Sequence, residues 1–218
     1  MKRVILLFLV LLTIIIANKN LISQNSVPNN VKHDLFIGTG LTVPFNLYGA
    51  TNLIGFKIAS SSRLFKSNIY FVSSFNYDLY GYEYYSGNYT MLITQVGIKY
   101  SKYSGKYFWG FQILGGSNIN FIPSEYYSDG YYEEWLEYDP GIGFVLSSGI
   151  FSGYYFNEKH TLAFKLETNF GYSSIINEYT NTWTYADDDY YYYYTDQEKN
   201  KFYFLNTKCG LVISFNDK

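Results

Sequence analysis

Few residues of this chain have the types that enzyme active sites use. The chain has two histidines, His33 and His160, and a single cysteine, Cys209. The histidines lie on separate segments, and neither shows a readable pairing with a carboxylate that would orient it for nucleophilic catalysis. One cysteine excludes an intramolecular disulfide and a cysteine-rich metal site, and the run Asp187–Asp189 lacks the spaced ligands of a calcium loop. We therefore expect no enzyme activity, no catalytic residues, no metal site and no cofactor.

A second group of candidates is charged and falls on the polar side of alternating segments. Its members are Lys57, Lys99, Lys165, Glu167 and Lys208. If that side is enclosed, each charge must be paired or hydrated, because burying an isolated charge is costly. Glu167 lies beside Lys208 on the next segment and shares a face with Lys165, which predicts a structural ion-pair cluster. The alternative is a narrow conduit in which rearranging pairs pass small ions.

Tyrosine, tryptophan and acidic residues are interleaved in two of the connections. The aromatic candidates are Tyr126, Tyr127, Tyr131, Tyr132, Trp135, Trp183, Tyr190, Tyr191 and Tyr192. Tyr and Trp provide a large contact area with few rotatable bonds, so these connections are candidates for stacking on sugars or holding a protein partner. The alternative is a solvated surface without a binding role. The acids there predict diffuse attraction of cations.

The elements that position these residues are strands, because the dominant period is two. Apolar residues from Leu162 to Phe170 alternate with small or polar ones, which is typical of a strand with two different faces. We count eight such segments: 34–43, 52–61, 68–79, 90–100, 106–120, 141–152, 160–173 and 201–215. Each is long enough for the roughly 9–11 tilted residues with which a strand crosses a bilayer.

The connections alternate in length and charge. The connections after the second, fourth and sixth segments are short. The first two of these carry only basic residues, namely Arg63, Lys66 and Lys102. The others are longer and mostly acidic. An up-and-down meander places all the short turns at one end and all the long loops at the other, with both chain ends on the short-turn side. The predicted strand number is therefore even.

The N-terminus predicts a targeting signal. Lys2 and Arg3 precede an apolar run from Val4 to Ala17. As a helix this run is about 21 Å long, too short for a hydrocarbon core of about 30 Å. We expect a cleavable signal peptide over residues 1–23, with cleavage near Ser23, before Gln24, and Ala17 as the alternative site. A single domain is expected over residues 24–218.

Composition narrows the class further. Apolar residues make up 48% of the chain, which excludes a disordered protein, and charged residues only 16%. The net charge of −2 and the lack of a basic block argue against a nucleic-acid partner. Glycines fall mainly on the side opposite the large apolar residues, as the narrow lumen of a small barrel requires. This favours a barrel with its apolar side toward lipid over a soluble β-sandwich.

With these features the chain resembles the small OmpA/OmpX-like outer-membrane β-barrels. The last segment, from Phe202 to Phe215, is similar to the terminal strand that such proteins present to the barrel-insertion machinery, although Asn216, Asp217 and Lys218 follow the aromatic residue. The resemblance covers nearly the whole mature chain but includes no sequence-specific motif. It implies a Gram-negative cell outer membrane, with the lipid bilayer and lipopolysaccharide as surroundings.

The sequence thus predicts an all-β, single eight-stranded antiparallel transmembrane barrel. We expect a structural or surface-binding role through long acidic, Tyr-rich extracellular loops that meet an extracellular ligand or protein. Two alternatives remain open at this point. One is a narrow porin-like channel, and the other is a secreted soluble β-sandwich or lipocalin-like binding protein.

Overall fold

The computed structural model of the chain describes residues 31–45, 50–51, 53–64, 67–82, 88–129, 131–185 and 192–216. The expected signal peptide lies outside these residues. The strands in the described residues are β1 (Val31–Phe45), β2 (Ala50–Thr51), β3 (Leu53–Arg63), β4 (Ile69–Tyr82), β5 (Asn88–Ser104), β6 (Tyr107–Phe121), β7 (Glu125–Ser128), β8 (Tyr132–Tyr138), β9 (Gly141–Tyr155), β10 (Leu162–Tyr185) and β11 (Tyr192–Asn216). The prediction of an all-β antiparallel fold is confirmed. No helix in the described part of the chain is long and apolar enough to cross a membrane.

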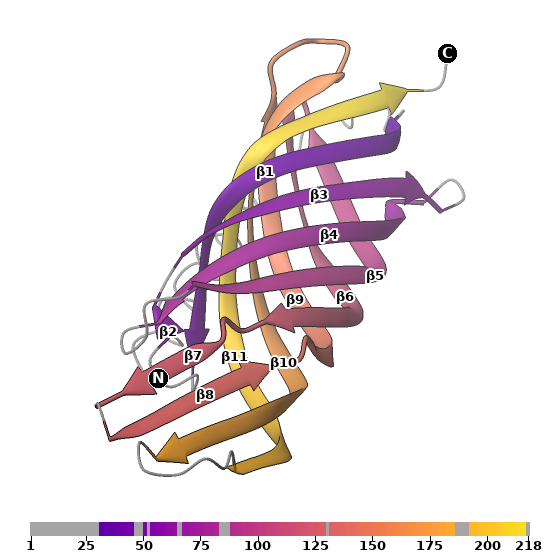
Figure 1. Cartoon of the computed structure of the whole chain (residues 1–218). Coiled ribbons are helices and arrows are strands. Elements are labelled where there is room, and N and C mark those ends of the chain that lie inside the picture. The colour runs from indigo at the N-terminus through magenta and orange to yellow at the C-terminus, as the bar shows by residue number, and fades with distance from the viewer. Residues whose placement is uncertain are drawn as a thin grey trace.

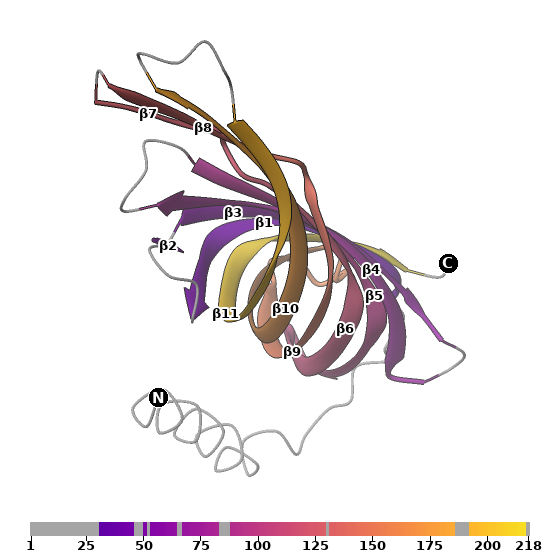
Figure 2. The same ribbon diagram turned by 60° about the horizontal axis from the view of Figure 1, so that its bottom comes forward.

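The long strands pair in a ring. Each is antiparallel to its neighbours in the order β1, β3, β4, β5, β6, β9, β10 and β11, and β11 pairs with both β10 and β1. The first and last long strands therefore meet along an extended register from Val31↔Asn216 to Phe45↔Tyr203. Figure 2 shows the resulting ring of strands, and Figure 1 shows it from the side.

The polarity of the two strand faces is the reverse of that in a soluble protein, where apolar side chains face inward. On β11, β1 and β3 the outward side chains are large, apolar and exposed: Ile54 is 64% and Phe215 is 56% exposed. The alternate side chains point into the ring and are small, polar or charged, and Lys208 there is 0% exposed. The apolar side thus surrounds the molecule, and the polar side is enclosed.

The interior of the ring has apolar layers at both ends. At the short-turn end a cluster forms from Val31, Phe36, Ala59, Phe108, Phe151, Tyr155, Ala163 and Val212. At the opposite end a second cluster forms from Tyr80, Met91, Ile93, Val145, Ile175, Phe202 and Phe204. Most of the buried polar and charged side chains lie on the same strands between these two clusters.

Two of the expected long loops are largely strand. The connection between β6 and β9 contains β7 and β8, and β8 pairs with β10 from Tyr179↔Tyr138 to Tyr185↔Tyr132. β10 and β11 extend beyond the ring and continue to pair as far as Trp183↔Tyr192. The expectation of plain loops was wrong here, because Thr, Tyr and Trp favour strands and cross-strand pairing even among many acids. Together these segments form a four-stranded sheet that projects from the ring (Figures 1 and 2).

Candidate functional site

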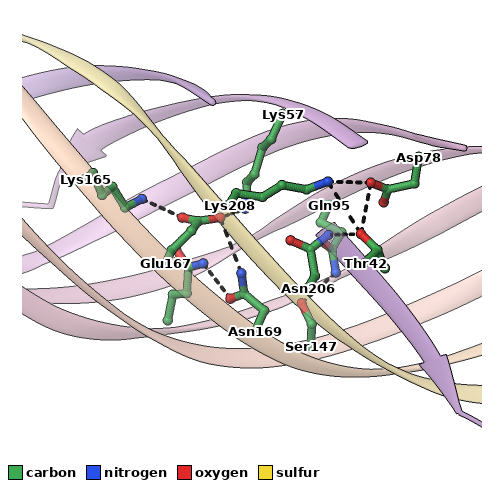
Figure 3. A network of polar contacts seen from close by, with 11 residues as sticks. Thr42, Lys57, Asp78, Gln95, Ser147, Lys165, Glu167, Asn169, Asn206 and Lys208 are labelled. Atoms are coloured by element: carbon green, nitrogen blue, oxygen red, sulfur yellow. Dashed lines mark hydrogen bonds and ion pairs between the residues drawn. The ribbon is translucent and has the colours of Figure 1, made fainter. Parts of the chain in front are cut away.

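The first candidate site is the group of buried charged side chains inside the ring, which we call the charged belt. Its members are Asp34, Lys57, Asp78, Lys99, Lys165, Glu167 and Lys208. Glu167 on β10 accepts from Lys57 Nζ on β3 at 2.6 Å and pairs with Lys165 Nζ on its own strand at 2.6 Å. Asn169 Nδ2 also donates to Glu167 at 3.3 Å, and Gln112 Nε2 donates to Asn169 at 2.7 Å. Figure 3 shows this group with the side chains pointing toward one another from across the ring. Of the charged residues named from the sequence, the structure brings Lys57 and Lys165 together around Glu167.

Lys208 takes a different partner from the one the sequence suggested. Glu167 and Lys208 are directly paired in the β10–β11 register. The ammonium of Lys208 nevertheless reaches Asp78 Oδ1 on β4 at 2.5 Å, and Thr42 Oγ1 at 3.4 Å. Thr42 also donates to Asp78 at 3.1 Å and accepts from Asn206 at 2.9 Å. Because Glu167 already serves two lysines, the longer reach to Asp78 spreads positive charge over two carboxylates.

Lys99 belongs to a third group, close to the short-turn cluster. Its Nζ lies 2.6 Å from Asp34 Oδ2 and 2.5 Å from Ser61 Oγ, and Ser61 in turn donates to Asp34. Two rings also face lysines here: Nζ of Lys99 lies 4.9 Å from the Tyr70 centroid, and Nζ of Lys165 lies 4.4 Å from that of Phe36. Ring faces attract cations electrostatically. They help to hold four buried lysines against the three buried acids in the described residues.

Asp34 was missed by the sequence analysis, although a signal for it exists. It opens the first predicted segment and has the same parity as Phe36 and Gly38, whose side chains point inward. The same parity identifies Thr42 and Asn206. Uncharged hydroxyl and amide groups carry little weight in a sequence pattern, so their place in the belt becomes visible only once the ring is closed.

The second candidate site is the projecting sheet, in which the strand order is β11–β10–β8–β7. Residues paired across an antiparallel sheet point to the same side, and neighbours along a strand alternate. The side continuous with the ring interior is called the inner face. It carries Glu125, Tyr127, Tyr132, Glu134, Leu136, Tyr138, Tyr179, Asn181, Trp183, Tyr185, Tyr192, Tyr194, Asp196 and Glu198. The outer face carries Tyr126, Glu133, Trp135, Glu137, Thr180, Thr182, Tyr193 and Lys199.

The predicted aromatic candidates divide between the two faces. Tyr127, Tyr132, Trp183 and Tyr192 lie on the inner face, whereas Tyr126 and Trp135 pack together on the outer face with centroids 4.3 Å apart. Tyr131 lies in the β7–β8 turn and is exposed. Tyr190 and Tyr191 lie outside the described residues.

Rings on the inner face form a continuous ladder. Tyr138 contacts Tyr179 with centroids 5.8 Å apart, Tyr179 contacts Tyr194 at 6.1 Å, and Tyr194 contacts Trp183 at 5.7 Å. Trp183 then stacks on Tyr192 at 5.9 Å with an interplanar angle of 17°. Tyr138, Tyr179 and Tyr194 were not predicted, because the segment pairing that aligns them lay inside supposed loops.

Two carboxylates lie close together on the inner face. Partial burial, and then the negative charge of Glu134, raise the pKa of Glu125 above its ordinary value. Glu134 accepts a short hydrogen bond from Asn181 Nδ2 on β10. The Oδ1 of Asn181 has no hydrogen-bond partner within the described part of the chain, and the residue is only 8% exposed. This corner of the sheet is thus rich in hydrogen-bond acceptors.

The two histidines are not brought to either site. His33 Nδ1 lies 3.0 Å from Ser62 Oγ, and His160 Nε2 lies 3.0 Å from the carbonyl oxygen of Gly105. Both positions belong to the short-turn end. Among the described residues, no three His, Cys, Asp or Glu side chains are placed to hold a metal ion.

The outward surface also has a hollow of about 460 Å³ across β3 to β6. Its lining combines small and hydroxylated residues, including Ser60, Ser73, Thr94 and Ser117, with Ile58 and Phe75. Thr94 and Ser117 hydroxyls lie 2.9 Å apart and satisfy each other. This hollow lies on the apolar side of the ring and is separate from both candidate sites.

No protein-family model and no curated protein matches the chain. Among solved structures, the outer membrane protein AlkL in DMPC lipid bilayers has a TM-score of 0.44 at 11% identity, over 89% of this chain and 95% of that one. The β-domain of the Bordetella autotransporter BrkA has a TM-score of 0.33 at 9% identity, over 86% of this chain and 100% of that one. A variant of the Rh. blastica porin has a TM-score of 0.13 at 7% identity, over 85% and 99% of the two chains. At these values the likenesses carry no argument about function, which depends on the geometry described above.

Proposed function

We propose that the chain is an integral outer-membrane protein whose eight long strands form a transmembrane barrel with a sealed lumen. The barrel anchors the projecting sheet at the cell surface, and binding occurs through that sheet. The observation that carries this proposal is the inverted polarity of the ring, with exposed apolar side chains around an enclosed polar belt. In water such a surface would be unstable, whereas lipid is its natural solvent.

The remaining parts of the proposal follow from the same arrangement. The signal peptide over residues 1–23 directs export, and β11, with Phe215 near its end, meets the barrel-insertion machinery. The short turns lie in the periplasm and the projecting sheet lies outside, next to lipopolysaccharide. The protein is not an enzyme in this proposal, because neither histidine lies in a candidate site.

A sealed lumen is favoured over a channel by the layers inside the ring. Any ion path must pass both apolar clusters, at Phe36, Phe108 and Phe151 on one side and at Phe202 and Phe204 on the other. An eight-stranded barrel leaves little space beyond its side chains. Neither the channel nor the soluble alternative has an observation of its own to support it.

Membrane extraction tests the proposal directly. Membranes from cells that express the chain are washed with carbonate at high pH and then treated with detergent. We expect the protein to stay in the pellet until detergent is added. Recovery in buffer without detergent would overturn the proposal.

Conductance in a planar bilayer separates anchor from channel. We expect no discrete openings from the purified protein. Salt-dependent openings that disappear on Glu167→Gln substitution would show that the lumen conducts, and the sealed-anchor proposal would then be wrong.

A further inference from the structure

We infer that the inner face of the projecting sheet binds an extended protein segment rich in arginine or lysine. This inference rests on the proposed function, in which the sheet is the binding surface, and it specifies the chemistry of the partner. Three features of the inner face carry it: the sign of its charge, the ladder of rings, and a corner with two carboxylates and a buried amide oxygen that has no donor within the described residues.

The charge on this face has a single sign. The ionisable acids on it are Glu125, Glu134, Asp196 and Glu198. Lys199 is the nearest base along β11, but its place in the β10–β11 register puts it on the outer face. Within the described strands of the sheet, the inner face therefore carries no basic side chain. A cationic partner supplies the missing charge, and an anionic one is repelled.

The aromatic ladder provides a second way to recognise the positive charge of the partner. The rings of Tyr179, Tyr194, Trp183 and Tyr192 run in contact across β10 and β11. Guanidinium and ammonium groups bind over the faces of Trp and Tyr, with arginine preferred. A row of rings beside carboxylates thus accepts a series of cationic side chains along an extended segment.

The corner at Glu125, Glu134 and Asn181 favours a cation that carries several N–H donors. Glu134 is held by Asn181 Nδ2, and the buried Oδ1 of Asn181 has no donor within the described residues. Glu125 and Glu134 repel each other, which raises the pKa of Glu125 in addition to the effect of partial burial. One guanidinium placed between them relieves the repulsion and donates to several acceptors at once.

A neutral glycan fits less well. Sugar rings could stack on the tyrosines, but sugar hydroxyls do not neutralise four carboxylates on one face. An anionic glycan meets the same charge with the wrong sign. The inference therefore commits to a basic protein segment, and glycan binding becomes an outcome of the test.

The test uses the full-length protein in detergent micelles and a fluorescent nona-arginine peptide. A nona-glutamate peptide and a neutral oligosaccharide are the comparison ligands. The decisive variants are Glu134→Gln and Glu133→Gln, which are adjacent on β8, change the net charge equally and lie on opposite faces. A third variant, Trp183→Leu, removes the central ring of the ladder. Circular dichroism and heat-dependent gel mobility verify that each variant is folded.

We expect the arginine peptide alone to bind. Glu134→Gln should weaken binding about tenfold, the worth of one charged hydrogen-bonded contact. Trp183→Leu should weaken it roughly fivefold through the loss of cation–π contacts. Glu133→Gln should change it by less than about twofold, as for a peripheral charge.

Two results would overturn the inference. Equal weakening by Glu133→Gln and Glu134→Gln would mean general attraction to an acidic surface. Oligosaccharide binding that is lost in Trp183→Leu, with no peptide binding, would identify a glycan surface instead. Either result leaves the barrel intact, whereas failure of the membrane-extraction experiment concerns the barrel and not the peptide.

Discussion

At the scale of single side chains, Glu167 is the most heavily used charge in the lumen. It pairs with Lys57 and Lys165, each at 2.6 Å, and is itself only 1% exposed. Glu167→Gln leaves two buried ammonium groups facing a neutral amide. Breaking a buried pair in this way costs about 3–5 kcal/mol, and we expect a loss of that order in the free energy of unfolding. Urea unfolding in lipid vesicles, followed by tryptophan fluorescence, measures it.

The matched control removes the whole group at once. In the triple variant Lys57→Met, Lys165→Met, Glu167→Met, no charge is left without a partner, and apolar side chains of similar length fill the space. Replacement of a complete buried group by apolar residues is often neutral or stabilising. We expect the triple variant to be more stable than Glu167→Gln alone. The opposite order would mean that the lumen is hydrated and that Glu167 is not closely coupled to its two lysines.

We expect Glu125 to make the proposed binding at the projecting sheet sensitive to acid. Burial and the neighbouring Glu134 raise its pKa in the folded chain. A raised acid pKa means that the folded state takes up a proton more readily than the unfolded one, so protonation favours the folded hairpin as pH falls through that pKa. Binding of a cation has the opposite sign, because it needs the ionised form. Because the pKa of Glu125 is raised, we expect affinity for the arginine peptide to begin to fall at a higher pH than an ordinary glutamate would cause.

The measurement is a series of peptide titrations between about pH 7 and pH 4, where carboxylates change charge. Glu125→Gln serves as the control, since it should bind more weakly at neutral pH and should show a flatter profile at pH values above those at which an ordinary glutamate titrates. An unchanged profile in Glu125→Gln would assign the acid sensitivity to another group.

At the scale of elements, the seam between β1 and β11 depends on a pair of glycines. Gly38 and Gly210 face each other in its register. A Cβ on Gly210 would collide with the carbonyl oxygen of Ile37 and with the Cα of Gly38, both of them backbone atoms. Backbone cannot move aside as a side chain tip can, so Gly210→Ala must push the two strands apart. Overpacking of this kind costs about 1–3 kcal/mol or more.

We therefore expect Gly210→Ala to reduce the amount of folded, membrane-inserted protein severalfold, measured by heat-dependent gel mobility. Gly115→Ala is the control, because a Cβ there points outward, with the Leu146 side chain at 3.1 Å and the Val145 carbonyl oxygen at an ordinary 4.0 Å. It should insert normally. Equal yields of the two variants would indicate that the seam tolerates separation.

The projecting sheet gives a second prediction for an element. Backbone within paired strands resists proteases, which need an extended, accessible segment. Protease added to intact cells should therefore cut at the β7–β8 turn, beside Asp129 and Tyr131, and not between Tyr132 and Tyr138. Mass spectrometry of the released peptides locates the cuts. Cleavage only near Lys102–Lys106 would mean that the orientation in the membrane is inverted.

The sequence predicted the elements of the ring better than their ends. Alternation places each of the eight predicted segments on one long strand, because a wall with two different faces imposes period two on every residue. The sequence pattern ended the seventh segment, which is β10, at Ser173, whereas the pairing of β10 with β11 continues to Trp183. Beyond the ring, both faces of the sheet are polar or aromatic, so the pattern that defines a strand disappears. Partners in the lumen were harder still, since parity says which side chains point inward but not that Lys208 reaches Asp78 across the ring.

At the scale of the whole molecule, the proposed function separates binding and anchoring along one axis. The short-turn end is filled by aromatic side chains, with Phe108 between Phe151 and Tyr155 at centroid distances of 6.4 and 5.1 Å. The other end carries the sheet, built by continuing β10 and β11 out of the wall itself. Because these strands are continuous, the β10–β11 pairing of the ring wall runs on into the sheet as far as Trp183↔Tyr192. A surface anchored in this way needs no linker and loses little orientational freedom on binding.

The single cysteine offers a direct test of which surface meets lipid. Cys209 lies on the outward face of β11, between Thr39 of β1 and Leu166 of β10, and it is exposed. In water an exposed thiol reacts readily with a charged maleimide, but a thiol in hydrocarbon is reached only by reagents that partition into lipid. In native membranes we expect a membrane-impermeant maleimide to leave Cys209 unlabelled and a lipid-soluble maleimide to label it. Tyr193→Cys in a Cys209→Ala background controls for access, since Tyr193 is 75% exposed on the projecting sheet and should react with both reagents. Labelling of Cys209 in the folded protein by the charged reagent would show that the apolar side faces water, and the proposal of a membrane anchor would then be wrong.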